Sequence, residues 1–424
     1  MVFGIGHLIS AVLCKKFIIR GLLWPTMRRL CLTCSFLLFI LLSSILASGI
    51  TNQNQNTGNY NSVSNSTYVG ANKSLSVGSV AELYLEDMVR DDFGNIYVIF
   101  LLDDADYPSP VVIDNYSSNS DDVVDTHIIG KFDSDLNLLW AFNATNVKEP
   151  RIELTSNQSI VIGGSFGQIG NAASSFHNQT GSKEMFFATI FPNGDLINFV
   201  KKNPPTGILI DDFALDSNDN IYVYGTVSCS SCTAPITFGP DTFYVPGFTE
   251  FFAKYNSSGF WDWGLSTTGN QWYTSDVRIN LDSSDNLIIS GTIGLNSNHG
   301  SMRSLLGVSQ INSHPEGNDG SGCFVIKMYN HNRTIQWHEK IYAEISGGMY
   351  CKAVNTDLNG NIIVAGEFSG SFRTNNSFAP SFGDIDIFIK KLNNTGSVLW
   401  ARNFGGTSAE KLHDMEIDSN GKIS

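Results

Sequence analysis

The sequence has few charged residues for its length, and one sign of charge is scarce in most of it. Lys, Arg, Asp and Glu together make up only 16% of the 424 residues. The first 50 residues hold five basic residues and no carboxylate, which leaves 21 basic against 40 acidic residues in the remainder. A body this acidic repels phosphate backbones, and no basic patch offsets the repulsion. We therefore expect no nucleic acid among its partners.

Catalytic and metal-binding motifs are also missing. The eight histidines show no H-E-x-x-H or comparable ligand spacing. Residues 163–167 match the G-x-S-x-G hydrolase elbow in their letters, but that elbow works only at a strand-to-helix turn, and no helix is expected here. The sequence therefore predicts a protein that is not an enzyme, with no catalytic and no cofactor-binding residues.

The N-terminus carries an export signal in one of two forms. An uncharged apolar run covers residues 30–50, after the Arg28-Arg29 pair. Its length suits an uncleaved signal anchor that spans a bilayer, and it equally suits a secretory signal cleaved at the small residues 47–49. A true start at Met27 would give a signal of ordinary length. Both alternatives place the residues after 50 outside the cytoplasm, secreted or at the cell surface. Membrane contact is then confined to the N-terminal segment.

The composition after the leader agrees with export. Residues 51–79 are polar and without periodicity, which predicts a flexible linker. Ten Asn-x-Ser/Thr sequons predict a glycoprotein. Four cysteines lie beyond the leader, an even number that fits disulfides in an oxidising compartment. The C-x-x-C pair Cys229 and Cys232 is interpreted as a local disulfide, and a pairing of Cys323 with Cys351 is a guess that no spacing supports.

From residue 80 onward the chain repeats itself about every 60 residues. One element is an Asp, replaced by Thr155 in the second copy, then three turn-like residues and a short β-branched strand. The residue four after this position stands at 95, 159, 220, 286, 361 and 422. The second element is an apolar stretch, a polar turn and often a tryptophan, namely Trp140, Trp263, Trp337 and Trp400, with Asn198 in the second copy. Two anchors with one period indicate a repeat architecture.

The repeats predict an all-β fold of the β-propeller type. Each holds four candidate strands and no helical periodicity, and a lone four-stranded unit cannot bury both of its faces. Units of this length fit propeller blades, with the tryptophans and β-branched residues between them. The predicted blades cover 80–145, 150–202, 207–266, 274–342 and 349–404, and a partial sixth covers 411–424. Because Ser424 falls inside that sixth copy, we expect the chain to be a fragment of a longer protein.

The stretch 385–424 resembles the seven-bladed β-propeller repeat (SBBP type) of exported microbial surface proteins. It contains an apolar strand, Lys-Leu-Asn, a Gly turn, Leu-Trp, Gly-Gly and an Asp-Ser-Asn-Gly turn. The pattern returns in degraded form across residues 80–424, with Phe100 in place of a glycine, Asn198 in place of a tryptophan, and paired glycines kept cleanly only at Gly405-Gly406. The resemblance implies a propeller and an exported setting, and it implies no catalytic residues.

Two groups of residues suggest binding sites. Oxygen-bearing side chains alternate in two of the turns, which hints weakly at calcium, although no downstream Glu closes either loop and ordinary hairpin turns are the preferred interpretation: Asp216, Asn218, Asn220, Asp357, Asn359 and Asn361. Trp261, Trp263 and Trp272 cluster, either as a sugar-stacking platform or as core between blades.

The predicted function is a surface or secreted binding or scaffold module with an unknown protein or glycan ligand. The alternatives are a propeller enzyme that acts on extracellular polysaccharide and a structural spacer of a larger adhesin-like protein. Acidic side chains that converge on one blade face would favour the enzyme, and dispersed ones would favour the scaffold.

Overall fold

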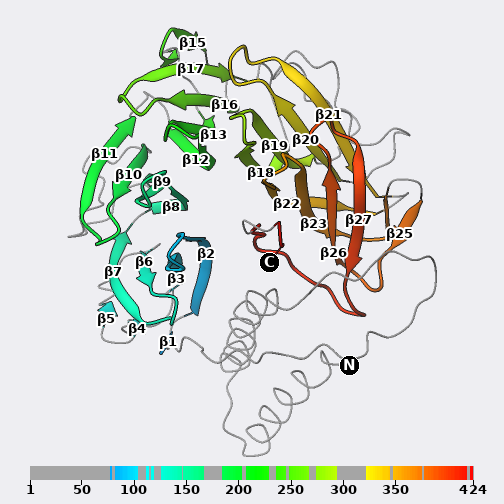
Figure 1. The fold of residues 1–424 in the computed structure, drawn as a ribbon, viewed down its shortest axis with the longest axis horizontal. Coiled ribbons are helices and arrows are strands. Elements are labelled where there is room, and N and C mark those ends of the chain that lie inside the picture. Colours follow the sequence, from blue (N-terminus) through cyan, green and yellow to red (C-terminus); the bar gives the residue numbers. More distant parts are fainter. Residues whose placement is uncertain are drawn as a thin grey trace, which may run out of the picture. The chain divides into compact units, whose positions relative to one another are not determined.

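Five four-stranded antiparallel sheets succeed one another along the chain, which confirms the predicted all-β propeller blades (Figure 1). The computed structural model describes residues 77–78, 82–103, 111–113, 116–118, 126–145, 147–166, 184–202, 207–228, 235–244, 248–266, 274–293, 321–343, 347–374, 377–417 and 421–423. Residues 78–421 form one compact unit. The predicted leader, nearly all of the predicted linker, and Cys229 and Cys232 lie outside the described residues. Within the described ranges no helix is long and apolar enough to cross a membrane.

Each blade is a meander in which the first, second, third and fourth strands pair in that order, and in blades 1, 3 and 5 two short strands lie between the second and the third. Blades 1 and 2 consist of β2 (Glu82–Arg90), β3 (Ile96–Asp103), β6 (Thr126–Phe132), β7 (Leu138–Thr145), β8 (Val147–Leu154), β9 (Ile160–Phe166), β10 (Met185–Ile190) and β11 (Leu196–Lys202). Blades 3 to 5 consist of β12 (Gly207–Leu215), β13 (Ile221–Ser228), β16 (Phe248–Tyr255), β17 (Trp261–Ser266), β18 (Thr274–Leu281), β19 (Leu287–Ile293), β20 (Gly322–Met328), β21 (Ile335–Tyr342), β22 (Met349–Thr356), β23 (Ile362–Phe368), β26 (Asp386–Leu392) and β27 (Val398–Phe404).

Short strands outside the blades lie in or before the connections: β1 (Val77–Gly78), β4 (Val111–Ile113), β5 (Tyr116–Ser118), β14 (Ile236–Phe238), β15 (Asp241–Phe243), β24 (Ser371–Arg373) and β25 (Phe378–Pro380). Figure 1 shows the first strand of each blade on the inside of the arc and the fourth strand on the outside. The first strands of successive blades contact one another, from β2 through β8, β12 and β18 to β22. Side chains on the first strands are therefore the ones that meet near the axis.

Side chains from neighbouring blades share the hydrophobic core. Tyr97 of blade 1 and Ile160 of blade 2 belong to one buried cluster, and Tyr222 of blade 3 and Leu287 of blade 4 belong to another. Burial of this kind explains why one blade does not suffice, because both of its faces are apolar.

Three of the four repeat tryptophans pack against the next blade, as predicted. Trp140 Nε1 donates to Pro192 O at 3.0 Å, and Trp337 Nε1 donates to Asn394 O at 2.9 Å. Trp263 is buried with residues of blade 4. Trp400 is half-buried on β27, the fourth strand of blade 5. Trp140 and Trp337, each on the fourth strand of a blade, thus donate a hydrogen bond to the turn between the third and fourth strands of the following blade.

The turns between first and second strands also connect the blades. Ser156 donates from N and Oγ to Asp219 at 2.7 and 2.8 Å, and Ser217 donates likewise to Asp285 at 3.0 and 2.7 Å. Asp219 and Asp285 have positive φ values of 60° and 58°, where glycine is the usual residue. The two aspartates occupy this strained conformation because their carboxylates accept hydrogen bonds from a serine of the preceding blade.

We expect Asp285→Ala to lower the free energy of unfolding by about 1 to 2 kcal/mol, because alanine loses both hydrogen bonds and keeps the left-handed backbone. Asp285→Gly loses the same hydrogen bonds but relieves the backbone strain, so its loss should be about 1 kcal/mol smaller. Urea unfolding followed by tryptophan fluorescence measures both variants. An alanine variant as stable as the glycine variant would contradict this explanation.

Cys323 on β20 and Cys351 on β22 form a disulfide, so the pairing that the sequence offered only as a guess is confirmed. The bond links the third strand of blade 4 to the first strand of blade 5. Cys351 N also donates to Thr292 Oγ1 at 2.9 Å across the same interface.

The chain continues past β27 toward the inside of the arc. Met415 is buried, and Leu412 N donates to Glu367 Oε1 at 2.9 Å. Glu416 Oε2 accepts a hydrogen bond from Asn355 Nδ2 on β22 at 3.4 Å, so this segment contacts the first two strands of blade 5. In blades 1 to 5 the first strand likewise contacts the first strand of the neighbouring blade.

Candidate functional site

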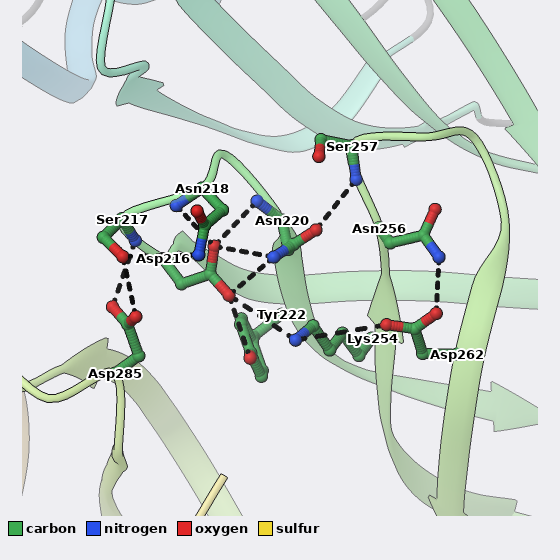
Figure 2. A network of polar contacts seen from close by, with 10 residues as sticks. All are labelled: Asp216, Ser217, Asn218, Asn220, Tyr222, Lys254, Asn256, Ser257, Asp262 and Asp285. Carbon is green, nitrogen blue, oxygen red and sulfur yellow. Dashed lines mark hydrogen bonds and ion pairs between the residues drawn. The ribbon is translucent and has the colours of Figure 1, made fainter. Parts of the chain in front are cut away.

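The predicted calcium candidates in blade 3 form the turn network drawn in Figure 2. Asp216 Oδ1 accepts the backbone N–H groups of Asn218 and Asn220, both at 3.0 Å. Its Oδ2 accepts from Asn220 Nδ2 at 2.8 Å and from the Tyr222 hydroxyl at 3.1 Å, and Lys254 Nζ lies 3.5 Å away. The carboxylate therefore already has donors on both oxygens.

The second candidate turn repeats this arrangement in blade 5. Asp357 Oδ1 accepts from the backbone N–H groups of Asn359 and Asn361, both at 2.9 Å, and Lys391 Nζ lies 2.7 Å from Oδ2. Burial acts to raise the pKa of Asp357, but Lys391 and the Asn361 hydrogen bonds outweigh it and lower the pKa to about 2. Within the described residues no three His, Cys, Asp or Glu side chains gather as a metal-binding group.

The other sequence candidates are parts of the core. Ser165, within the G-x-S-x-G match, is fully buried on β9, and its Oγ accepts the N–H of Ile210 at 2.8 Å. Trp261 packs against Phe238, with ring centroids 4.8 Å apart, whereas Trp263 lies in the cluster shared with blade 4. Trp272 is outside the described residues. The two described tryptophans, Trp261 and Trp263, thus belong to two different core clusters.

A different set of residues meets near the axis. Each of the five first strands has a β-bulge at the same place. Regular pairing with the second strand begins again at the residue four positions before the turn Asp, or before Thr155 in blade 2. Bulges re-aim side chains and are frequent beside functional sites. The residues at this position in order along the chain are Asp87, Arg151, Asp212, Arg278, Ala353 and Asp414. Charge thus alternates in sign over four successive blades.

The aspartates of this set connect neighbouring first strands. Asp87 Oδ2 accepts the N–H of Ile152 in the next blade at 2.9 Å, and Asp212 Oδ2 accepts the N–H of Ile279 at 2.7 Å. Arg151 Nη1 donates to Glu86 O in the preceding blade at 3.2 Å. Its Nε is buried and has no hydrogen-bond partner. One donor of this set, Arg151 Nε, therefore has no hydrogen-bond partner within the described residues.

A second layer lies two residues further along each strand. Glu153 occupies this position in blade 2, and Asn280 and Asn355 occupy it in blades 4 and 5. Asn280 Nδ2 donates to Asn355 Oδ1 at 3.3 Å, and Asn355 in turn reaches Glu416. We call the two layers, together with Glu86 and Asp211 at the bulges, the axial cluster: Glu86, Asp87, Arg151, Glu153, Asp211, Asp212, Arg278, Asn280, Asn355, Asp414 and Glu416.

The carboxyl groups of the axial cluster hold protons more tightly than usual. Burial raises the pKa of Asp87 to about 7, with Asp414 adding to the effect and Arg151 opposing it. Burial likewise raises the pKa of Glu416 to about 8, with help from Asp414 and Asp87. The pKa of Glu153 is also raised, first by burial and then by Asp87. Perturbed carboxyl groups that influence one another mark a functional-site candidate.

Sequence reasoning missed the axial cluster although a signal existed. The repeat is defined by the turn Asp and the strand after it, and the axial residues lie before that turn. Reading four positions back from each turn would have found the Asp, Arg, Asp, Arg alternation. The bulge that aims these side chains has no sequence signature of its own, so their convergence needed the structure.

Comparison with known proteins adds little about function. No protein-family model matches the chain. A stretch of 230 residues is 25% identical to the uncharacterized WD repeat-containing protein L264 of Acanthamoeba polyphaga mimivirus, covering 48% of this chain and only 16% of that protein. The chain thus spans much less than two thirds of that relative.

Several solved structures align with much of the chain at low similarity. A protein of unknown function from Dyadobacter fermentans has 8% identity and a TM-score of 0.38 over 76% of this chain and 93% of its own. An ulvan lyase, a polysaccharide lyase, has 11% identity and a TM-score of 0.40 over 75% of this chain and 69% of its own. The Dos1 propeller has 7% identity and a TM-score of 0.37 over 80% of this chain and 73% of its own.

Proposed function

We propose that the protein is an exported binding module and that the axial cluster is its ligand site. The observation that supports the proposal is the convergence of carboxyl, amide and guanidinium groups from all five first strands, together with the unpartnered Arg151 Nε. The side chains of the repeated turns, by contrast, already satisfy one another. A mixture of donors and acceptors suits a ligand rich in hydroxyl groups, and arginine adds affinity for a carboxylate or sulfate on it. An acidic or neutral glycan has this chemistry.

Binding to an array of extracellular glycans, followed by calorimetry on the best ligand, tests this proposal. Arg151→Gln should weaken binding at least tenfold, because the guanidinium is the cationic group with an unused donor. Asp195→Asn on an exposed outer turn is a matched control that should bind like the wild type. Binding that survives Arg151→Gln unchanged would place the ligand elsewhere.

A second candidate function is hydrolysis or cleavage of an extracellular polysaccharide. Burial raises the pKa of Asp87 to about 7, and the charges of Arg151 and Asp212 act on it. A carboxyl group with a pKa near neutrality can serve as a general acid or base. Release of new reducing ends from a polysaccharide panel, lost in Asp87→Asn, would favour this candidate. Glycan binding without any product would favour the binding module.

The shifted carboxyl groups predict a stability that falls as pH rises. Unfolded Asp and Glu titrate near pH 4, whereas in the fold Asp87 and Asp211 have pKa values of about 7 and Glu416 of about 8. The folded state therefore binds more protons between about pH 4 and 8, and its stability is lost across that window as pH rises.

Thermal unfolding at pH 5 and pH 8 checks this dependence. We expect a lower Tm at pH 8, and a smaller difference between the two pH values in the double variant Asp87→Asn/Glu416→Gln. The explanation would be contradicted if the wild-type Tm were higher at pH 8 and the Tm of the double variant changed with pH by the same amount.

We further propose kinship with the seven-bladed repeat family and export to the cell surface or medium. Five consecutive blades with the family's turn and tryptophan pattern support the kinship, and the uncharged run 30–50 supports export. Fusion of residues 1–79 to a reporter enzyme active only outside the cytoplasm tests export. Retention of the reporter inside the cell would refute it.

A further inference from the structure

Blade 5 contains a buried carboxylate oxygen that lacks a donor. Asp386 begins β26 and is fully buried, and its Oδ1 has no hydrogen-bond partner. Its Oδ2 accepts the N–H of Phe382 at 2.5 Å. An ionised oxygen that is buried without a donor or a cation is costly, so such an atom needs an explanation.

A second carboxylate borders the same space. Glu410 N donates to Ile385 O at 2.8 Å, which places Glu410 next to the start of β26. Its Oε2 accepts the N–H of Gly406 at 3.2 Å. A Cβ on Gly405 would collide with Asp386 Oδ1 and lie 2.8 Å from Glu410 Oε2. Both carboxylate oxygens therefore lie close together against Gly405, where only a residue without a Cβ fits.

Blade 2 shows how the same position is neutralised elsewhere in the chain. Glu184 in blade 2 is equivalent to Asp386 in blade 5. Each lies two residues before the phenylalanine that pairs with a glycine of the second strand, namely Phe186 with Gly164 and Phe388 with Gly366. Glu184 is also buried, and Lys201 Nζ of the fourth strand lies 3.7 Å from its Oε2. The chain itself supplies the cation in blade 2.

The equivalent cation is missing from blade 5. Lys201 pairs with Phe186, and the residue that pairs with Phe388 is Asn403. Asn403 donates to Pro380 O at 2.8 Å and carries no charge. In the part of the chain that the structure describes, no basic side chain forms an ion pair with Asp386 or Glu410. Two carboxylates thus share a space without a neutralising group.

We propose that Asp386 and Glu410 bind a calcium-like divalent cation at Gly405-Gly406. Two carboxylates and neighbouring backbone carbonyls are hard oxygen ligands, and water completes a calcium shell. The cation replaces the lysine of blade 2 and fastens the segment after β27 to the start of β26. This site is separate from the turns at Asp216 and Asp357, whose oxygens have donors, and it does not depend on the axial cluster.

Calcium titration of the metal-stripped full chain tests the proposal. Calorimetry should find one site with a Kd of about 0.1 to 1 mM, typical of extracellular modules, and 10 mM calcium should raise Tm by about 2 to 5 °C. Asp386→Asn and Glu410→Gln should both abolish the heat of binding and the Tm shift. Asp195→Asn is the acidic control that should keep them.

A lysine placed as in blade 2 gives an independent measurement. Asn403→Lys should remove calcium binding and raise the calcium-free Tm above that of the calcium-free wild type, because the lysine takes the place of the cation. Absence of binding to the wild type at 10 mM calcium would overturn the proposal. Unchanged binding in Asp386→Asn would overturn it equally.

Discussion

Replacement of Gly366 by alanine is expected to lower the free energy of unfolding by about 3 kcal/mol or more. Gly366 lies on β23, and a Cβ there would collide with the carbonyl oxygen of Tyr350 and lie 2.8 Å from the Phe388 ring. The carbonyl belongs to the paired strand β22 and the ring is fully buried, so neither neighbour can move without breaking the blade.

Gly164→Ala is the matched control, because Gly164 occupies the same position in blade 2. Its Cβ would lie 3.2 Å from Val147 and 3.3 Å from Phe186, and no backbone atom is among these neighbours. We expect the free energy of unfolding to change little. Alanine favours a strand more than glycine does, and the small shifts of Val147 and Phe186 that make room for its Cβ offset this gain. Denaturant unfolding of both variants decides the point, and equal losses would show that the Tyr350 carbonyl is not the cause.

The same position explains a departure from the repeat that the sequence left unexplained. In blades 2 to 5 a glycine on the second strand pairs with a phenylalanine on the third, as Gly366 pairs with Phe388. In blade 1 the phenylalanine is on the second strand instead of the third: Phe100 pairs with Ile128, and both are buried. One aromatic ring fills the space either way, as cross-strand packing requires.

This pair illustrates what sequence reasoning could and could not establish. The number of blades and the Asp turns followed from spacing, because turn chemistry and strand alternation are local. The exchange of Phe100 for glycine could not be interpreted, because its compensation lies across a strand pair. Likewise the buried Asp386 looked like an ordinary strand residue, since its isolation depends on Asn403, which is distant in sequence.

A recurring ion pair shows a similar compensation and carries the second large expected effect. In blade 4 the turn residue Asp282 and the third-strand Lys327 lie 2.7 Å apart, with only 5% and 4% of their side chains exposed. The same pair recurs in blades 1, 3 and 5. In blade 2 both members change together, to Thr155 and Thr189. The chain thus contains both a charged and a neutral form of one interaction.

Lys327→Met should therefore cost about 3 to 5 kcal/mol, because it leaves the buried Asp282 carboxylate without its counter-charge. The double variant Asp282→Thr/Lys327→Thr should recover most of that loss, since Thr155 in blade 2 satisfies its turn by donating from Oγ1 to Ser159 O at 3.0 Å. Urea unfolding at pH 7 of the wild type, the single variant and the double variant measures the recovery. If the double variant is no more stable than Lys327→Met, the cost lies in lost packing around the lysine stem and not in the uncompensated charge.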